Sequence, residues 1–341
     1  MSVKEVEKCM GVSEQEDMKI KGYDLNMKGL KMIKEYEWSN HEEWLAIRRQ
    51  YIGGSDAGAV IGMNPYKSSY TLWAEKTGKI PEFEGNITTK VGTYLEELVA
   101  QMFEEETGKK VRRKNRTMVN DIYPFACANV DRLVVGEKAL LEIKTTNSIP
   151  LMKKLRGSDE FPDAYYAQVV HYLAVTGLEK AYLAVLINCR EFKVYELNRD
   201  QAEIDALMKA EAEFWKLVEN NTPPVADGSD STSETLTTLY PESNDDRVDL
   251  FAYDNDLKEY MALTAQIKAL TALKDDVGNK IKEYMKEAGK GESANYKVSY
   301  ASSERRTFDS KKFASDHKDM ILDPYYKVTT TRMFKVTKKG A

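Results

Sequence analysis

FACANVDRLVV (residues 125–135) and ALLEIKTT (residues 139–146) are two aliphatic and β-branched runs separated by a Gly-Glu pair. Their composition and the intervening turn predict the two strands of a hairpin. Asp131 lies in the first run and Glu142 in the second. Because side chains alternate along a strand, Glu142 and Lys144 point to the same face. The hairpin is therefore expected to bring two carboxylates and an ammonium group into one pocket.

This set of side chains suits a metal-dependent reaction. Two close carboxylates repel each other, and one is forced to stay protonated unless a cation joins them. Oxygen ligands without His or Cys favour Mg²⁺ or Mn²⁺. Such a site suits phosphodiester hydrolysis, in which Lys144 orients the water or neutralises charge in the transition state. Glu96 and Glu97 offer a further carboxylate, and Gln168 supports the pocket from a later helix.

The same spacing also fits exposed strand residues, whose Glu and Lys side chains merely pair at the surface and contribute little to stability. Asp131 and Glu142 both lie in apolar runs, however, where an unpaired charge is costly. This context favours the metal site.

Helices and strands alternate around the hairpin. Helix periodicity, caps and Gly or Pro stops predict helices over residues 40–51, 55–61, 69–78, 88–107, 163–177 and 199–220. Two further strands are predicted over residues 180–188 and 191–197. Helices before, between and after four strands predict an α/β domain over residues 40–222.

The remaining segments have a different character. Residues 1–39 alternate charges without a sustained apolar face, which indicates a loosely attached leader. Residues 223–250 are acidic and rich in Pro, Ser and Thr, as expected for a linker. In residues 251–341, apolar positions at steps of three and four from Leu263 to Tyr284 predict a helix that packs on a partner surface. Strands over residues 295–302 and 325–337, around a short helix, are expected to follow it.

Composition excludes several classes of protein. The 341 residues contain no apolar run near the ~18 residues of a membrane span, so no membrane partner is expected. Three scattered cysteines fit a reducing cytoplasm. The net charge is -5, yet residues 109–116 (KKVRRKNR) carry six cations. This run suits either a contact with the DNA backbone or a solvated loop that balances nearby glutamates.

Several motifs together resemble those of the YqaJ-type viral recombinase family, in order and in spacing. They are Ile52-Gly53-Gly54-Ser55-Asp56-Ala57, Asn64-Pro65-Tyr66-Lys67-Ser68, Leu72-Trp73, Lys76-Thr77-Gly78, Gly92 with Glu96, Asn129-Val130-Asp131, Leu141-Glu142-Ile143-Lys144-Thr145 and Tyr165-Tyr166-Ala167-Gln168-Val169-Val170-His171-Tyr172. This family is related to phage lambda exonuclease and belongs to the PD-(D/E)xK nuclease superfamily. The resemblance covers residues 40–222, and it departs from the pattern where Val130 replaces the signature proline.

The resemblance implies a restriction-endonuclease-like core, a central mixed β-sheet flanked by helices, with a C-terminal helix and β appendage. It also implies roles for particular residues. The metal-binding groups are Glu96, Asp131, Glu142 and the carbonyl of Ile143, the catalytic lysine is Lys144, Gln168 falls on the family's Gln position, and Arg48 and Ser55 hold the 5′ phosphate. Glu97 and Arg49 adjoin two of these positions and remain alternatives.

The chemistry of these residues supports the assignment of Arg48 and Ser55 to the binding of the 5′ phosphate. A guanidinium can clamp a terminal phosphate with two hydrogen bonds, and the Gly53-Gly54 turn lets backbone N–H groups approach it. The alternative is that Gly-Gly-Ser is only a tight turn with a helix cap.

The implied activity is that of a 5′-to-3′ exonuclease on linear double-stranded DNA. With Mg²⁺ or Mn²⁺ it would leave 3′ overhangs for phage-type homologous recombination. A ring-shaped trimer and a single-strand annealing protein as partner are implied by the same resemblance. Two alternatives remain: a structure-selective endonuclease on the same core, and a DNA-binding module whose nuclease pocket is silent. A nucleotide-driven machine is disfavoured, because the sequence has no G-x-x-x-x-G-K-[ST] loop.

Overall fold

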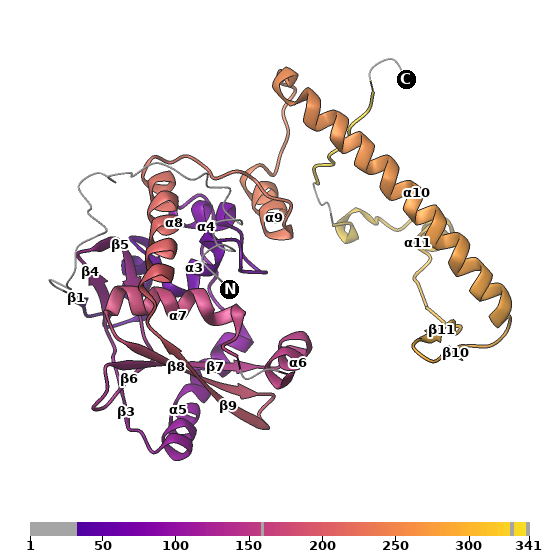
Figure 1. Ribbon diagram of the computed structural model, residues 1–341. Helices are drawn as coiled ribbons and strands as arrows, with labels where there is room; N and C mark the ends of the chain where they lie inside the picture. The colour runs from indigo at the N-terminus through magenta and orange to yellow at the C-terminus, as the bar shows by residue number, and fades with distance from the viewer. Residues whose placement is uncertain (1–32, 158–159, 328–330, 339–341) are drawn as a thin grey trace. The chain divides into compact units, whose positions relative to one another are not determined.

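The computed structural model describes residues 33–157, 160–327 and 331–338. The chain divides into two compact units, Met1–Leu239 and Tyr240–Ala341 (Figure 1). The boundary thus falls inside the predicted linker, residues 223–250. Residues 1–32 of the predicted leader lie outside the described residues.

The first unit combines helices with two sheets. Its helices are α2 (His41–Arg49), α3 (Gly54–Val60), α4 (Ser69–Lys76), α5 (Ile87–Thr107), α6 (Ile149–Gly157), α7 (Asp163–Thr176), α8 (Gln201–Glu219) and α9 (Asp230–Leu239). Its strands are β1 (Ile33–Tyr36), β2 (Ile52–Gly53), β3 (Val111–Arg113), β4 (Thr117–Asn120), β5 (Tyr123–Ala128), β6 (Arg132–Val134), β7 (Ala139–Thr146), β8 (Lys180–Ile187) and β9 (Glu191–Asn198).

The larger sheet has five strands in the order β3-β6-β7-β8-β9. The β7 and β8 strands are parallel, and the other neighbours are antiparallel, so the sheet is mixed. Helices α5 and α7 lie on its two faces (Figure 1). On β7, Leu141 and Ile143 pack with Val99 and Phe103 of α5. The expected α/β core, a mixed β-sheet flanked by helices as in restriction-endonuclease-like proteins, is confirmed.

The predicted hairpin is present, but its first strand is divided. Residues 125–135 do not form one strand: β5 belongs to a four-stranded sheet of order β1-β4-β5-β2, whereas β6 belongs to the larger sheet. Ala128 pairs with Met118 of β4, and Arg132 pairs with Leu141 of β7. The chain therefore passes from one sheet to the other through Asn129-Val130-Asp131. This placement puts Asp131 at the seam between the sheets.

Helix α9 lies within the predicted linker and packs against α4. Two of its leucines, Leu236 and Leu239, pack against the core, and several of its other contacts are made by hydroxyl groups. Two leucines are too few for an apolar periodicity that would indicate the helix. Thr71 of α4 forms hydrogen bonds with Ser231 at 2.7 Å and with Thr235 at 2.8 Å.

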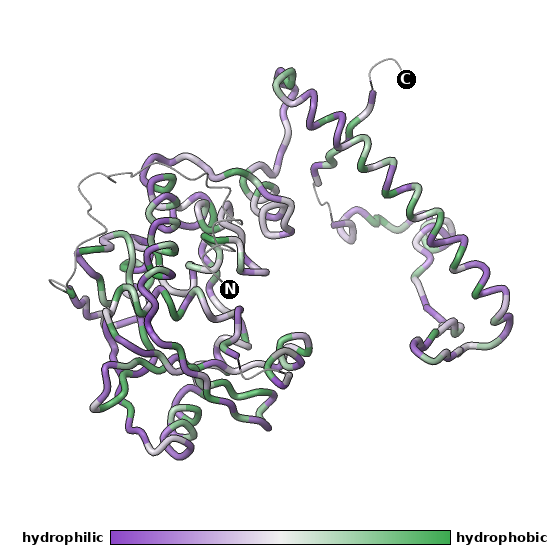
Figure 2. Tube along the Cα trace, in the orientation of Figure 1, coloured by the Kyte–Doolittle hydropathy of each residue, from purple (hydrophilic) through white to green (hydrophobic). Residues whose placement is uncertain are grey.

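The second unit contains the predicted helix and β appendage. Its elements are η1 (Phe251–Tyr253), α10 (Asp254–Met285), the β10 (Lys290–Glu292) and β11 (Lys297–Ser299) hairpin, α11 (Ser310–Asp316) and η2 (Asp323–Tyr325). Hydrophobic and hydrophilic residues alternate along α10, and its apolar side chains are exposed (Figure 2). The strand expected over residues 325–337 is wrong for the described part of that range, which pairs with no other strand. Of the helices described, none combines the length and apolarity that crossing a bilayer requires.

Candidate active site

The carboxylate of Asp131 is anchored to the strand that carries the second acid. Its Oδ2 atom accepts a hydrogen bond from the backbone N–H of Ile143 at 2.7 Å. Burial, and next the negative charge of Glu142, raise the pKa of Asp131 well above 3.8, although Lys144 and the Ile143 N–H act in the opposite direction. The two acids are thus close enough for one to oppose the ionisation of the other.

Glu142 lies on the face of β7 that is turned away from α5, and it is 2% exposed. Its Oε1 atom accepts hydrogen bonds from Lys144 Nζ at 2.6 Å and from Gln168 Nε2 at 2.7 Å. Its Oε2 atom is buried and has no hydrogen-bond partner in the part of the chain that the structure describes. A buried carboxylate oxygen without a partner is costly, and a cation would satisfy it.

Lys144 keeps its charge in this pocket. Burial lowers the pKa of a lysine, but the carboxylates of Glu142 and Asp131 outweigh it and raise the pKa of Lys144 above 10.5. The ring of Tyr165 lies 5.6 Å from Nζ and adds a cation–π contact. The structure therefore brings Asp131, Glu142, Lys144 and Gln168 into one cluster.

Unlike these four residues, Glu96 is held by an arginine at the edge of the cluster. Its carboxylate pairs with the guanidinium of Arg132, a side chain that is 3% exposed and also donates to the backbone oxygen of Asp131 at 2.7 Å. Glu96 still acts electrostatically on Asp131, whereas Glu97 pairs with Arg132 and Arg113 at the surface. Among residues 33–157, 160–327 and 331–338, no three His, Cys, Asp or Glu side chains are arranged to hold a metal ion.

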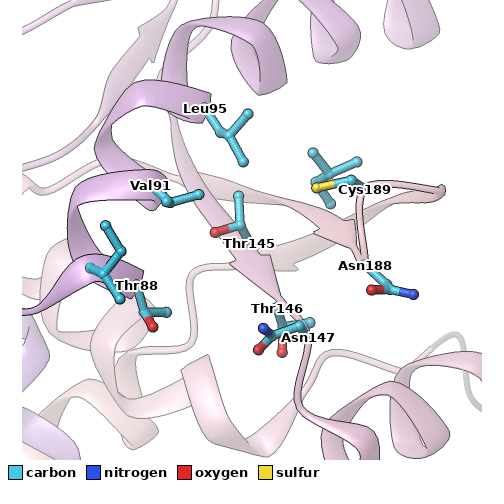
Figure 3. A pocket seen from close by; sticks show the side chains of 10 residues that line it. Thr88, Val91, Leu95, Thr145, Thr146, Asn147, Asn188 and Cys189 are labelled. Atoms are coloured by element: carbon cyan, nitrogen blue, oxygen red, sulfur yellow. The ribbon is translucent and has the colours of Figure 1, made fainter.

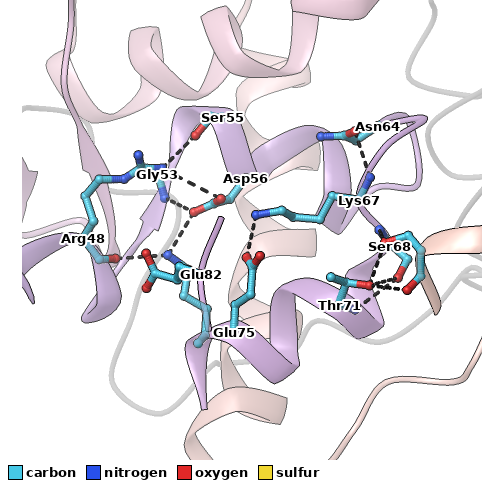
Figure 4. A network of polar contacts seen from close by, with 12 residues as sticks. Arg48, Gly53, Ser55, Asp56, Asn64, Lys67, Ser68, Thr71, Glu75 and Glu82 are labelled. Carbon is cyan, nitrogen blue, oxygen red and sulfur yellow. Dashed lines mark hydrogen bonds and ion pairs between the residues drawn. The ribbon is translucent and has the colours of Figure 1, made fainter. Parts of the chain in front are cut away.

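A second polar cluster contains Arg48 and Ser55. The Nη2 atom of Arg48 donates to Ser55 Oγ at 2.8 Å (Figure 4). Arg49, the neighbouring alternative, instead donates to Glu82 at 2.9 Å. Arg48 also lies over the ring of Trp44, 4.7 Å from its centroid. Arg48 is therefore the arginine that the structure groups with Ser55.

Asp56 of α3 and Lys76 of α4 form an ion pair beside this cluster. Asp56 is 4% exposed, and its Oδ2 atom accepts from the Gly53 N–H at 3.1 Å and from Lys76 Nζ at 2.9 Å. Lys76 Nζ also donates to the backbone oxygen of Arg48 at 3.1 Å. Burial raises the pKa of Asp56, but Lys76 and Arg48 outweigh it and hold this pKa well below 3.8. Asp56 and Lys76 both lie in the family motifs, but their sequence context predicted no role for either residue.

The basic run at residues 109–116 is largely paired with glutamates, which favours the solvated alternative. Its ion pairs are Lys109 with Glu137, Lys110 with Glu104, Arg113 with Glu97, Lys114 with Glu35, and Arg116 with Glu35 and Glu37.

A cavity of about 330 Å³ lies between α5 and the end of β7, and none of the four residues of the carboxylate cluster lines it (Figure 3). Val91 and Leu95 of α5 line one side, and Thr145, which follows Lys144, lines the other. Its lining is mainly apolar, so it lacks the cations that a site for the DNA backbone requires.

Comparisons with known proteins agree with the motifs. The sequence model of the YqaJ-like viral recombinase domain matches residues 43–179. Over 310 residues, the chain is 40% identical to the uncharacterized protein YqaJ of Bacillus subtilis (strain 168), covering 89% of this chain and 95% of that protein. Protein D345L of African swine fever virus (strain Badajoz 1971 Vero-adapted) is 33% identical over 75 residues, 22% of each chain. The crystal structure of an alkaline exonuclease from Laribacter hongkongensis has a TM-score of 0.46 and 22% identity, covering 53% of this chain and 93% of that chain.

Proposed function

Because the chain belongs to the family of YqaJ-like viral recombinase domains, we propose that it is a metal-dependent exonuclease acting on linear double-stranded DNA. The proposed direction is 5′ to 3′, which leaves 3′ overhangs for phage-type homologous recombination. The observation that carries the proposal is the paired carboxylates of Asp131 and Glu142 beside a charged lysine.

We assign Asp131, Glu142, Glu96 and the carbonyl of Ile143 as ligands of Mg²⁺ or Mn²⁺. The unpartnered Oε2 atom of Glu142 and the oxygen-only set of donors support this assignment. When bound, such an ion lowers the pKa of a water and stabilises negative charge on the phosphate. The carboxylate of Glu96 also pairs with the guanidinium of Arg132, which holds it beside the cluster.

Other residues of the chain promote hydrolysis, orient Glu142 and bind the 5′ phosphate. Lys144 supplies a positive charge next to Glu142, where it orients a water or neutralises the charge of the transition state. Gln168 fixes the orientation of Glu142 through its amide N–H. Arg48 and Ser55 hold the 5′ phosphate of the strand to be digested, and Asp56 with Lys76 keeps Arg48 in place.

The proposal extends to assembly. Residues 40–222 carry the nuclease, and residues 251–341 form an extension. In a ring-shaped trimer, basic residues would face a central channel and acidic residues would face outward, which lets a chain of net charge -5 bind DNA. A single-strand annealing protein would bind the overhangs.

The test uses linear duplex DNA carrying a different label at each end of each strand, incubated with Mg²⁺. We expect labels at the 5′ ends to be released first, and a covalently closed circle to remain intact. Cleavage of the circle would instead support a structure-selective endonuclease. Binding without any digestion would support a silent DNA-binding module.

A further inference from the structure

Tyr172 connects the two halves of the proposed site. It lies on α7, one turn after Gln168, and is 6% exposed. Its ring packs directly on Gly54, at the start of α3: a Cβ atom added to Gly54 would lie 2.4 Å from Tyr172 Cε1. Only glycine leaves room for the ring at this position.

Among the described residues, the phenolic group of Tyr172 has a hydrogen-bond donor but no acceptor. It accepts from Gln168 Nε2 at 3.1 Å, and the same amide nitrogen donates to Glu142 Oε1 at 2.7 Å. The Tyr172 O–H itself donates to no atom of the described residues. A buried hydroxyl that lacks an acceptor is costly, and a ligand oxygen would satisfy it.

The charges around the phenol show where that ligand would lie. Burial, and next the charges of Glu142 and Asp131, raise the pKa of Tyr172 well above 10, so the group keeps its proton. The positive charge of Arg48 acts on the same phenol. The hydroxyl is therefore within electrostatic reach of both the carboxylate cluster and the Arg48–Ser55 cluster.

We propose that the Tyr172 hydroxyl donates a hydrogen bond to a phosphate oxygen of the DNA strand held between the Arg48–Ser55 cluster and the carboxylates. The ring on Gly54 then acts as a rigid spacer between the two clusters. This inference rests on the proposed function, and it adds a residue that contacts substrate to those assigned above.

The test compares Tyr172→Phe with Tyr166→Phe, a matched control on the same helix whose hydroxyl bonds to Glu203. Binding of a blunt duplex with 5′ phosphates is measured by fluorescence anisotropy in Ca²⁺, and kcat/KM is measured in Mg²⁺. Loss of a hydrogen bond to a charged group should weaken binding and lower kcat/KM by about ten- to a hundredfold in Tyr172→Phe. Tyr166→Phe should behave as the unmodified protein does.

Unchanged binding and unchanged kcat/KM in Tyr172→Phe would overturn the inference. A purely structural role would lower the melting temperature without changing the dissociation constant, which also overturns it. If the unmodified protein binds the duplex but does not digest it, the proposed exonuclease fails, while the anisotropy comparison still decides the role of Tyr172. Gly54→Ala is a second variant: it displaces the ring and should weaken binding in the same way, and unaltered binding would refute the spacer.

Discussion

Asp131 Oδ2 accepts a hydrogen bond from the backbone N–H of Ile143, 2.7 Å away. Asp131 is thereby fixed to Ile143, the residue that directly follows the second acid, Glu142, in the chain. Since Glu142 is held in turn by Lys144 and Gln168, the two carboxylates keep their proximity despite their repulsion. The arrangement stores unfavourable electrostatic energy that a bound cation would relieve.

Asp131→Asn should separate stability from function. The amide oxygen can still accept from Ile143, while the repulsion with Glu142 disappears. In the presence of EDTA we expect the variant to be more stable than the unmodified protein, by on the order of 1 kcal/mol. Mg²⁺-dependent digestion should fall at least about a hundredfold, and the rise in melting temperature with Mn²⁺ should be lost. Glu196→Asn, at an exposed position of β9, is the control. Full digestion by Asp131→Asn would refute the site.

Lys144→Met keeps most of the side-chain volume and removes the ammonium that Glu142 accepts from. Because this charge acts on the transition state, kcat should fall by about 10²–10³ with little change in KM. Lys180→Met, at an exposed pair with Glu196, should leave both constants unchanged. A change confined to KM would mean that Lys144 binds DNA rather than promoting hydrolysis.

Arg48→Ala should remove the preference for phosphorylated 5′ ends. Its guanidinium is the one grouped with Ser55, so kcat/KM on phosphorylated duplexes should fall by about ten- to a hundredfold and approach the value on hydroxyl ends. The adjacent Arg49→Ala removes an equal charge that is paired with Glu82 and should keep the preference. The assignment fails if the unmodified protein already digests both kinds of end at the same rate.

Asp56→Asn should destabilise the protein by about 3–5 kcal/mol at neutral pH, because it leaves the buried ammonium of Lys76 without its carboxylate. The folded pKa of Asp56 lies well below 3.8, so the stabilisation is fully present above pH 3.8 and is lost as the pH falls through the folded value. Urea unfolding followed by circular dichroism should therefore give a constant difference between the two proteins from pH 5 to 8. A difference that vanishes within this range would contradict the assignment.

The sequence predicted the elements whose signal is local. Strand β7 is an apolar run with two charged residues on one face, and α5 and α7 end at Gly108 and Gly177, which have φ values of 69° and 66°. The hairpin of β6 and β7 follows from the turn between them. These features depend on residues that are neighbours in the chain.

The features that were not predicted depend on distant partners. Strands β2 and β3 have only two and three residues, too few for a periodic pattern. The buried pair of His171 and Glu211 joins α7 to α8, and no local pattern links residues so far apart. For the same reason the pairing of Glu96, a predicted metal ligand, with Arg132, the residue that follows Asp131, was not expected.

Asp131 lies where the chain passes from one hydrogen-bonded sheet to the other. Its position is therefore fixed by the strand pairings of both sheets. Heating cannot release this acid without dismantling pairings of β5 or of β6. Thermal inactivation should therefore coincide with cooperative melting of the first unit rather than precede it, as it would if the acid lay on a long, loosely held loop.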